Sequence, residues 1–292
     1  MERNTIIRFK GVSREFIAAD GAVRVLNDVD FAVERNSFTV IFGPSGSGKT
    51  TILNIILGLL PPTSGTVLVN GQNLYALSQD ERANFRAGHY GMVSQTNSWI
   101  NSLSVVENIA MPLYYRGYSH AEAMKQAIIS LNRVDMGKYA NYRPTVLSVG
   151  QQQRIQMARA TVDTPMILVA DEPTGSLDSK TGDQIMQLIT SFKNHGDTTV
   201  ILVTHNADYI SLSDHRIFIR DGELVDDEGG YHGGENPDRV KLANAFSTAL
   251  AEADKQKTVS VVTKPVKAAK PTVAKPAGMK SQAQTKPKRG KK

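Results

Sequence analysis

The chain has 292 residues, enough for one large domain or two small ones, and 40% of them are hydrophobic, which supports a buried core. It has no cysteine, which excludes disulfides and thiolate metal sites, and its longest apolar run, 52–60, is too short to span a bilayer. The net charge of +6 is unevenly placed: residues 255–292 hold 12 of the 34 Lys and Arg and no acid, so residues 1–254 sum to −6. The basic character therefore belongs to the C-terminal segment.

Residues 4–42 are predicted to form strands. Val29, Phe31 and Val33 alternate with polar neighbours, which favours a half-exposed antiparallel strand, whereas the apolar run 38–42 suits a buried strand. Phe16 lies in the same segment. Its position by itself fits either core packing or a stacking platform for an aromatic base.

Residues 43–50 read Gly-Pro-Ser-Gly-Ser-Gly-Lys-Thr, the G-x-x-x-x-G-K-[ST] pattern of a phosphate-binding loop. Its glycines permit positive φ, so the loop amides and the N-terminus of a helix predicted over 51–60 can face phosphates. Lys49 is predicted to reach the β- and γ-phosphates, and the Thr50 hydroxyl to bind Mg²⁺. The alternative, a Gly/Ser linker, would produce this pattern by chance in roughly one chain in a hundred of this length. We expect Pro61-Pro62 to end the helix.

A strand over 66–70, a turn at Asn70-Gly71 and a strand over 89–94 come next, and Gln95 ends that strand. Residues 97–160 change character and predict a helical insert with helices over 105–111 and 119–133, the second opened by a Ser119–Glu122 capping box. Trp99, the only tryptophan, is as compatible with core packing as with a surface role. A polar loop at 147–154 leads into a further helix that ends before Pro165.

Residues 166–170 form a continuous apolar strand that ends in Asp171-Glu172. In a protein with a phosphate loop, this placement predicts that Asp171 holds Mg²⁺ and that Glu172 is a general base, although a simple helix N-cap acid is the alternative. A helix over 180–194 ended by His195-Gly196, a buried strand over 199–203 and a hairpin over 217–226 follow. His205 comes after the buried strand, so it is expected at the same sheet edge as Asp171, in a structural or a catalytic role.

Asn236-Pro237 predicts the start of a helix that runs to about residue 254. Residues 255–292 are rich in Lys, Pro, Ala and Thr and nearly lack aromatic side chains, which predicts a basic disordered tail.

Taken together, these residues resemble the ATP-binding subunits of ABC transporters over about residues 4–228. Residues 43–50 match the Walker A loop, Leu147-Ser148-Val149-Gly150-Gln151 is similar to the family signature, and 167–172 match Walker B with its catalytic glutamate. Ser176-Leu177-Asp178 looks like the D-loop, Gln95 the Q-loop, His205 the switch histidine and Phe16 the aromatic A-loop position.

The resemblance implies an α/β fold of the phosphate-loop NTPase class, with an antiparallel β subdomain, a RecA-like core and a helical subdomain at about 97–160. The implied domains are an ATPase domain over 1–228, a C-terminal helix over 229–254 and the tail over 255–292. It also implies hydrolysis of ATP with Mg²⁺. The implied catalytic residues are Glu172, His205 and Gln95, and the implied metal ligands are Thr50, Gln95 and Asp171. The implied nucleotide-binding residues are Phe16, Gly43, Pro44, Ser45, Gly46, Ser47, Gly48, Lys49, Thr50, Thr51, Ser148, Gly150, Gln151 and Asp178.

As partners, the resemblance implies a second copy in a head-to-tail dimer and an integral membrane permease, with the ATPase peripheral on the cytoplasmic face of the cell membrane. Its subgroup is similar to the lipoprotein-release and macrolide-exporter ATPases (the LolD/MacB type), with the cell-division ATPase FtsE as the alternative. Trp99 is expected to line the groove that receives a permease helix. The basic tail is expected either to contact anionic lipid or merely to solubilise the chain, and no specific nucleic acid is expected.

Two residues depart from the family pattern: Val149 stands in place of the second signature glycine, and Ser94 replaces a common Phe before Gln95. Because Ser148 and Gly150 are kept, weakened rather than lost activity is expected. Among competing classes, a regulatory GTPase would carry a guanine-reading N-K-x-D, which we do not find. A small-molecule kinase is a second competing class, and an ABC protein of translation or repair is a third. Proteins of that translation or repair class usually carry two nucleotide domains or a long inserted coiled coil, and this chain has neither.

Overall fold

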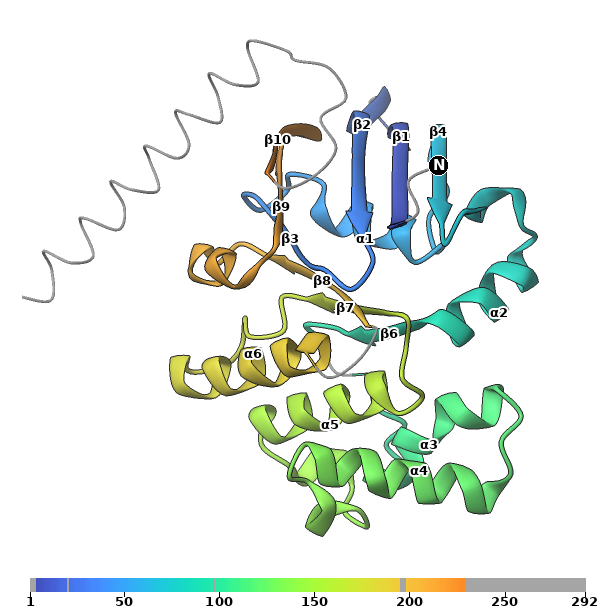
Figure 1. The fold of residues 1–292 in the computed structure, drawn as a ribbon, viewed down its shortest axis with the longest axis vertical. Helices are drawn as coiled ribbons and strands as arrows, with labels where there is room; N and C mark the ends of the chain where they lie inside the picture. Colours follow the sequence, from blue (N-terminus) through green and yellow to red (C-terminus); the bar gives the residue numbers. More distant parts are fainter. Residues whose placement is uncertain (1–3, 20, 97, 195–197, 229–292) are drawn as a thin grey trace, which may run out of the picture. The chain divides into compact units, whose positions relative to one another are not determined.

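The computed structural model describes residues 4–19, 21–96, 98–194 and 198–228. All of these belong to the first of the two units into which the chain divides, Met1–Thr248. The predicted helix over 236–254 and the predicted basic tail lie outside the described residues, as does the predicted helix end at His195-Gly196. Figure 1 shows the order of the elements along the chain.

An antiparallel sheet is built mostly from the N-terminal residues. It has the order β2-β1-β4-β5, with β1 Thr5–Ala18, β2 Gly21–Glu34, β4 Ser64–Val69 and β5 Gln72–Asn73. Strands β1 and β2 form a long hairpin in which Phe9 stacks on Phe31, with their ring centroids 4.4 Å apart. Val29 and Phe31 are buried as the alternation predicts, but Ala32 is buried too, so the end of β2 is covered on both faces rather than half-exposed.

The second sheet has the order β10-β9-β3-β8-β7-β6. Its strands are β3 Phe38–Phe42, β6 Tyr90–Val93, β7 Ile167–Asp171, β8 Thr199–Thr204, β9 His215–Arg220 and β10 Glu223–Glu228. Strands β9, β3, β8, β7 and β6 pair in parallel, and β10 pairs antiparallel with β9. The carboxyl ends of β3, β8, β7 and β6 therefore lie side by side at one edge of this sheet.

The central strands of the second sheet are buried on both faces, which is why they are continuous apolar runs in the sequence. Val40, Leu202 and Leu168 belong to a core cluster shared with the helices after β6. Their neighbours Ile41, Ile201 and Val169 belong to a second cluster shared with β1, β2 and α1. The sheet thus separates two apolar layers.

The helices are α1 Lys49–Ile56, α2 Gln79–His89, α3 Val105–Tyr115, α4 His120–Arg133, α5 Val149–Thr161 and α6 Ser179–Asn194. Short 3₁₀ turns lie at Leu74–Ala76, Gly137–Tyr139, Pro144–Val146 and Ala207–Leu212. The Ser119–Glu122 capping box of α4 is confirmed, and the same device opens α2, α3 and α5. The sequence interpretation missed α2, although Ser78 and Glu81 carry the same signal. Within the described ranges, no helix is long and apolar enough to cross a membrane.

The end of α1 corrects one expectation. The helix ends at Ile56 and not at Pro61-Pro62, because Gly58 has φ +68° and reverses the chain first. The Gly58 N–H donates to Ile55 O at 3.1 Å and the Leu59 N–H donates to Asn54 O at 2.9 Å. This pair of bonds is the glycine-based Schellman end of a helix.

Candidate functional site

The residues singled out from the sequence gather where four parallel strands end. Strand β3 leads into the glycine loop, β7 ends at Asp171, β8 ends just before His205, and β6 ends two residues before Gln95. These strands are neighbours in the order β3-β8-β7-β6, so the side chains after them come together at the carboxyl edge. That edge is where open α/β sheets bind ligands.

The glycine loop has a backbone that larger residues would disturb. Gly43, Gly46 and Gly48 have φ of +155°, +82° and +101°. A Cβ on Gly43 would collide with the carbonyl oxygen of Ile219, and one on Gly48 would lie 2.7 Å from Leu26 Cδ2. Glycine at these two positions therefore provides both the conformation and the room that a tight loop needs.

Two observations show that the loop suits a phosphate ligand. The Ser47 hydroxyl is buried, and in the described structure its oxygen has no hydrogen-bond partner, which a bound oxyanion would provide. The Lys49 ammonium is also buried and donates to the carbonyls of Gly43 and Pro44, at 2.8 Å each. The cation is therefore held against the loop, where incoming phosphates can contact it.

At this edge the Lys49 cation lies near two carboxylates, Asp171 and Glu172, which repel each other. Burial lowers the pKa of Lys49, and the nearby charges of Glu172 and Asp171 partly raise it again. Burial raises the pKa of Asp171, and the negative charge of Glu172 raises it further, while Lys49 opposes both. A divalent cation would relieve the repulsion between these two acids. No cluster of three His, Cys, Asp or Glu side chains suited to a metal occurs in the described part of the chain, so Thr50 and Gln95 would have to add their oxygens to that of Asp171.

The carboxylate of Glu172 is held in place by contacts to both of its oxygens. Its Oε1 lies 2.7 Å from His205 Nδ1, and its Oε2 accepts a hydrogen bond from the Thr204 hydroxyl at 3.3 Å. Its own N–H donates to Val203 O at 2.9 Å, and its φ is +45°, an uncommon value for glutamate. Two neighbouring strands therefore hold one carboxylate in a defined place. The sequence interpretation missed Thr204, whose only signal was its position as the last residue of β8.

Gln95 is exposed and lies close to the loop after Glu172. A Cβ on Gly175 would be 3.3 Å from Gln95 Nε2 and 3.9 Å from Glu172 Cβ. Thr50 is exposed and Thr51 half-buried in the first turn of α1, directly after Lys49. Gln95, Glu172, His205, Asp171 and Lys49 thus share one edge, and for His205 and Asp171 the sequence had predicted this.

The signature residues lie elsewhere, at the N-terminus of α5. Ser148 caps this helix by accepting from the Gln151 N–H at 3.3 Å, and Gln151 Nε2 donates to the Tyr139 hydroxyl at 2.9 Å. Gly150 packs closely on α6, since a Cβ there would lie 2.7 Å from Thr181 Cγ2. In the described structure the hydrogen bonds of Ser148 and Gln151 stay within 134–161, so these residues do not join the phosphate loop of their own chain.

Two other residues predicted to bind nucleotide, Asp178 and Phe16, also contact residues close to them in the sequence. The Asp178 carboxylate accepts from the Thr181 N–H at 3.0 Å and from its hydroxyl at 2.8 Å, at the start of α6. Phe16 lies near the tip of the β1–β2 hairpin, is 37% exposed, and has the Arg14 guanidinium 4.6 Å above its ring centroid. One face of the Phe16 ring is therefore covered by Arg14.

Trp99 is half-buried and not a free anchor. It packs against the core cluster of the helical insert, its Nε1 donates to Gln152 Oε1 at 2.9 Å, and the Arg159 guanidinium lies 4.6 Å from its ring centroid. These contacts tie the segment after Gln95 to α5. These contacts show that Trp99 packs against the helical insert, and its role in a permease groove stays a prediction.

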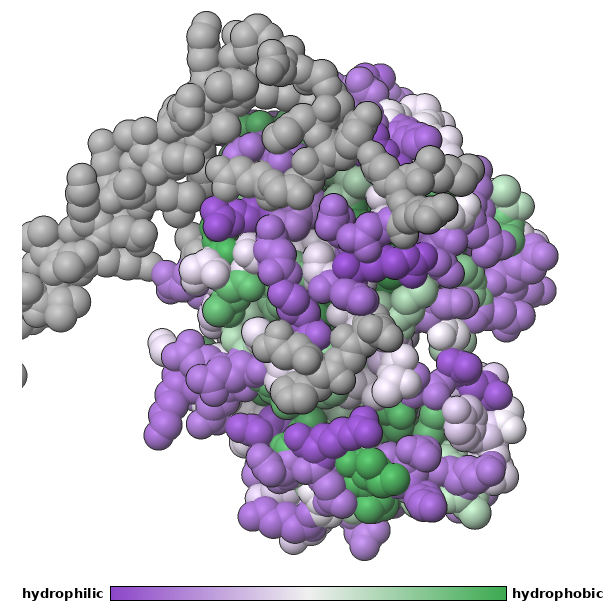
Figure 2. All heavy atoms as spheres, viewed as in Figure 1, coloured by the Kyte–Doolittle hydropathy of each residue, from purple (hydrophilic) through white to green (hydrophobic). Residues whose placement is uncertain are grey.

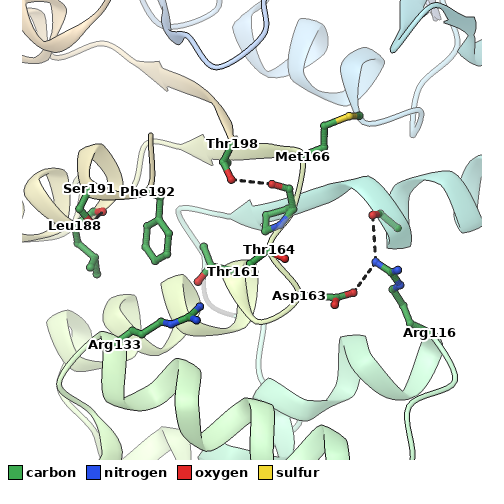
Figure 3. A pocket seen from close by; sticks show the side chains of 12 residues that line it. Arg116, Arg133, Thr161, Asp163, Thr164, Met166, Leu188, Ser191, Phe192 and Thr198 are labelled. Atoms are coloured by element: carbon green, nitrogen blue, oxygen red, sulfur yellow. Dashed lines mark hydrogen bonds and ion pairs between the residues drawn. The ribbon is translucent and has the colours of Figure 1, made fainter. Parts of the chain in front are cut away.

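A cavity of about 940 Å³ lies at the opposite edge of the sheet (Figure 3). Met166 and Thr198 on its wall precede β7 and β8, and the cavity also borders the last turns of α4, α5 and α6. Arg116 bonds there to Asp163 at 2.5 Å and to Gly88 O at 3.2 Å, and both arginines that Figure 3 labels stand at helix C-termini. Since cations are favoured at helix C-termini, these arginines have a structural explanation. None of the residues predicted to bind nucleotide lines this cavity.

Comparison with known proteins gives a consistent result. A family model described as ABC transporter matches residues 26–175. The macrolide export ATP-binding/permease protein MacB 2 of Yersinia pestis bv. Antiqua (strain Antiqua) is 35% identical over 241 residues, which cover 82% of this chain and 35% of that protein. The chain thus spans about a third of the length of such relatives.

A shorter relative is matched over most of its length. The lipoprotein-releasing system ATP-binding protein LolD of Colwellia psychrerythraea (strain 34H / ATCC BAA-681) is 38% identical over 213 residues, which cover 73% of this chain and 83% of that protein. Among solved structures, the dimeric post-hydrolysis state of the ATP-binding cassette MJ0796 bound to ADP and Pi superposes with a TM-score of 0.72 at 35% identity, covering 76% of this chain and 98% of the other. The fold predicted from the sequence is confirmed.

Proposed function

Because the chain belongs to the ABC transporter family and is an ATPase homologous to MacB and LolD, we propose that it works as a head-to-tail dimer that drives a separate membrane permease. The observation that carries the catalytic part is the Glu172 carboxylate, held by His205 and Thr204 at the edge where Lys49 and Asp171 also lie. The cargo is left open, since it depends on the permease.

Binding of the nucleotide depends on the loop after β3. The loop amides and the N-terminus of α1 favour anions, and the Lys49 ammonium can exchange its two carbonyl contacts for phosphate oxygens. The phosphates would raise the pKa of Lys49 again, since they add negative charge beside a cation that burial now disfavours. The exposed ring face of Phe16 remains for stacking on the base, opposite Arg14.

Mg²⁺ would be held by the Thr50 hydroxyl, Gln95 and Asp171, and when bound it supplies charge neutralisation between the phosphates. Glu172 is then left as the carboxylate that accepts the proton of the attacking water. His205 contacts Glu172 Oε1 at 2.7 Å, so it orients this base and keeps it from turning away. We therefore assign Glu172 as the base and His205 as a positioning residue.

The dimer accounts for the signature residues. Ser148, Gly150 and Gln151 stand at the N-terminus of α5, and among the residues that the structure describes they make no hydrogen bond to the phosphate loop of their own chain. The positive end of the α5 dipole suits a phosphate supplied by a second copy. Val149, which is 47% exposed at the first turn of α5, would face that copy, and Asp178 would lie beside it. The dimeric state of the related cassette MJ0796 supports this arrangement.

Subunit mixing tests the composite site. Lys49→Ala removes phosphate binding in one subunit, and Ser148→Asp keeps the helix cap while repelling phosphate in the other. A head-to-tail heterodimer of these two inactive variants has one site with both defects and one intact site, so mixing should restore ATP hydrolysis. If the mixture is as inactive as each variant alone, the site lies within a single chain and the dimer proposal is wrong.

The permease proposal draws on LolD, a relative described as the ATP-binding protein of a lipoprotein-releasing system. Figure 2 shows one group of hydrophobic side chains among mostly hydrophilic ones in the lower part of the view, where Figure 1 places α3 to α5. Exposed apolar residues of this helical part include Ile100, Tyr115, Ile128, Ile129, Tyr142 and Val146. Such groups suit a protein partner. Co-purification with a four-helix permease encoded by a neighbouring gene would identify the partner, and Trp99→Ala should weaken that complex while sparing basal hydrolysis.

A further inference from the structure

The turn between β9 and β10 is joined to the phosphate loop, although it is far from it in the sequence. The Gly222 N–H donates to the Ser47 carbonyl at 3.1 Å, and the Gly222 carbonyl accepts from the Asn27 N–H at 2.9 Å. Beside these backbone bonds, Asn27 Nδ2 donates to Glu223 Oε1 at 2.8 Å. The turn therefore bridges β2 and the phosphate loop.

This bridge leaves no room for a side chain. Gly222 has φ +78°, and a Cβ there would collide with the Val25 carbonyl oxygen and lie 3.3 Å from Leu26 Cα. Leu26 is the residue whose Cδ2 would also meet a Cβ on Gly48. The turn, β2 and the loop are thus packed backbone to backbone at one point.

The bond to Ser47 has a consequence for the loop amides. In a planar trans peptide, the C=O of Ser47 and the N–H of Gly48 point in opposite directions. A carbonyl anchored on Gly222 therefore turns the Gly48 N–H away from the turn. Amides of this loop are the groups that cradle phosphates.

We propose that Gly222 is a positioning residue for nucleotide binding: its backbone N–H, held by β2 through Asn27, fixes the Ser47–Gly48 peptide so that the Gly48 amide faces the phosphates. The inference rests on the nucleotide binding proposed for residues 43–50, but not on the dimer or the permease. It assigns a role to a turn that sequence reasoning identified only as the connection of a hairpin.

The chain offers a matched control in a second Asx-Gly turn whose two residues have nearly the same φ values. Asn70-Gly71 has φ of +53° and +78°, and Asp221-Gly222 has +50° and +78°. Within the described part of the chain, a Cβ on Gly71 meets no atom within 4 Å. Alanine therefore causes the same backbone strain at both positions, but only at Gly222 does it break contacts with β2 and the phosphate loop.

The experiment compares Gly222→Ala, Gly71→Ala and the parent by titration with a fluorescent ADP analogue, steady-state ATP hydrolysis and thermal unfolding. We expect Gly222→Ala to raise Kd and KM by about fivefold or more, the factor that corresponds to one net hydrogen bond of about 1 kcal/mol. The kcat of the folded protein should change much less, since the loop binds substrate and transition state alike. Gly71→Ala should lower Tm and leave Kd and KM unchanged.

Asn27→Ala covers the case in which Gly222→Ala does not fold. It removes a half-exposed side chain that donates to Glu223 Oε1 and accepts from Arg24 Nη1 at 3.0 Å, and it keeps the backbone bond from the Asn27 N–H to Gly222 O. It should raise Kd by about twofold, within the range of one exposed hydrogen bond. If the parent binds the analogue and both Gly222→Ala, where folded, and Asn27→Ala bind it equally well, the positioning role is refuted. If the parent itself does not bind, the proposed function fails instead.

Discussion

Replacing Glu172 by Gln tests the assignment of the general base most directly. The substitution keeps the length and planarity of the side chain, so the contacts to His205 Nδ1 at 2.7 Å and to the Thr204 hydroxyl at 3.3 Å can both be retained. The backbone bond to Val203 O does not involve the side chain. What is lost is the basicity of the carboxylate.

The expected loss of rate follows from that difference. Removal of a general base lowers kcat by about 10² to 10⁴, which is about 2.7 to 5.5 kcal/mol in the activation free energy. ATP binding should be at least as tight as in the parent. The substitution removes a negative charge near Lys49 and Asp171, and in the parent this charge repels the phosphates. His205→Ala should lower kcat less, since it removes the group that positions the base and not the base itself.

The assay is phosphate release under saturating MgATP, with nucleotide affinity measured separately on the same preparation. Glu122→Gln is the matched control, because Glu122 is an exposed capping-box residue of α4 and glutamine serves in the corresponding position of α5. If Glu172→Gln turned over ATP as fast as Glu122→Gln does, Glu172 could not be the base.

Three further predictions concern stability, packing and the tail. Asp171→Asn should abolish Mg²⁺-dependent hydrolysis and yet raise the Tm of the nucleotide-free protein at pH 7, because the raised pKa of Asp171 means that its charged form is disfavoured in the fold. The gain in Tm should shrink as the pH falls toward 3.8, the ordinary pKa of Asp, where the parent side chain becomes neutral as well. An unchanged or lower Tm at pH 7 would contradict this prediction. Gly150→Ala should lower Tm, because the added Cβ would collide with Thr181 Cγ2. If Gly150 also contacts nucleotide bound to a partner subunit, adding Thr181→Ser should restore Tm but not ATP hydrolysis. Recovery of both Tm and hydrolysis would mean that Gly150 has a packing role alone. Removal of residues 255–292, which carry 12 basic groups and no acid, should reduce flotation with anionic but not neutral liposomes and leave ATP hydrolysis unchanged, and equal flotation of both versions with anionic liposomes would exclude a membrane role for the tail.

Local sequence patterns determined much of the fold of this protein. The phosphate loop, the buried strands and the capping box of α4 each depend on residues within a few positions of one another, so their signals can be read directly. The edge shared by Asp171, Glu172, His205 and Gln95 was also predictable, because residues that follow parallel strands of one sheet meet at one edge. The specific roles of these residues came from the family resemblance and remain predictions.

Other features required the tertiary structure because they depend on contacts between distant segments. Only the assembled sheet shows that Glu172 is held by Thr204 and His205, that Arg14 covers one face of Phe16, and that Trp99 is tied to α5. The clearest case is Gly222: its sequence context, Asp-Gly between two strands, is that of any tight hairpin, just as Asn70-Gly71 is. Packing alone places one of these two turns against the phosphate loop and the other in open space, and no local pattern in the chain distinguishes them.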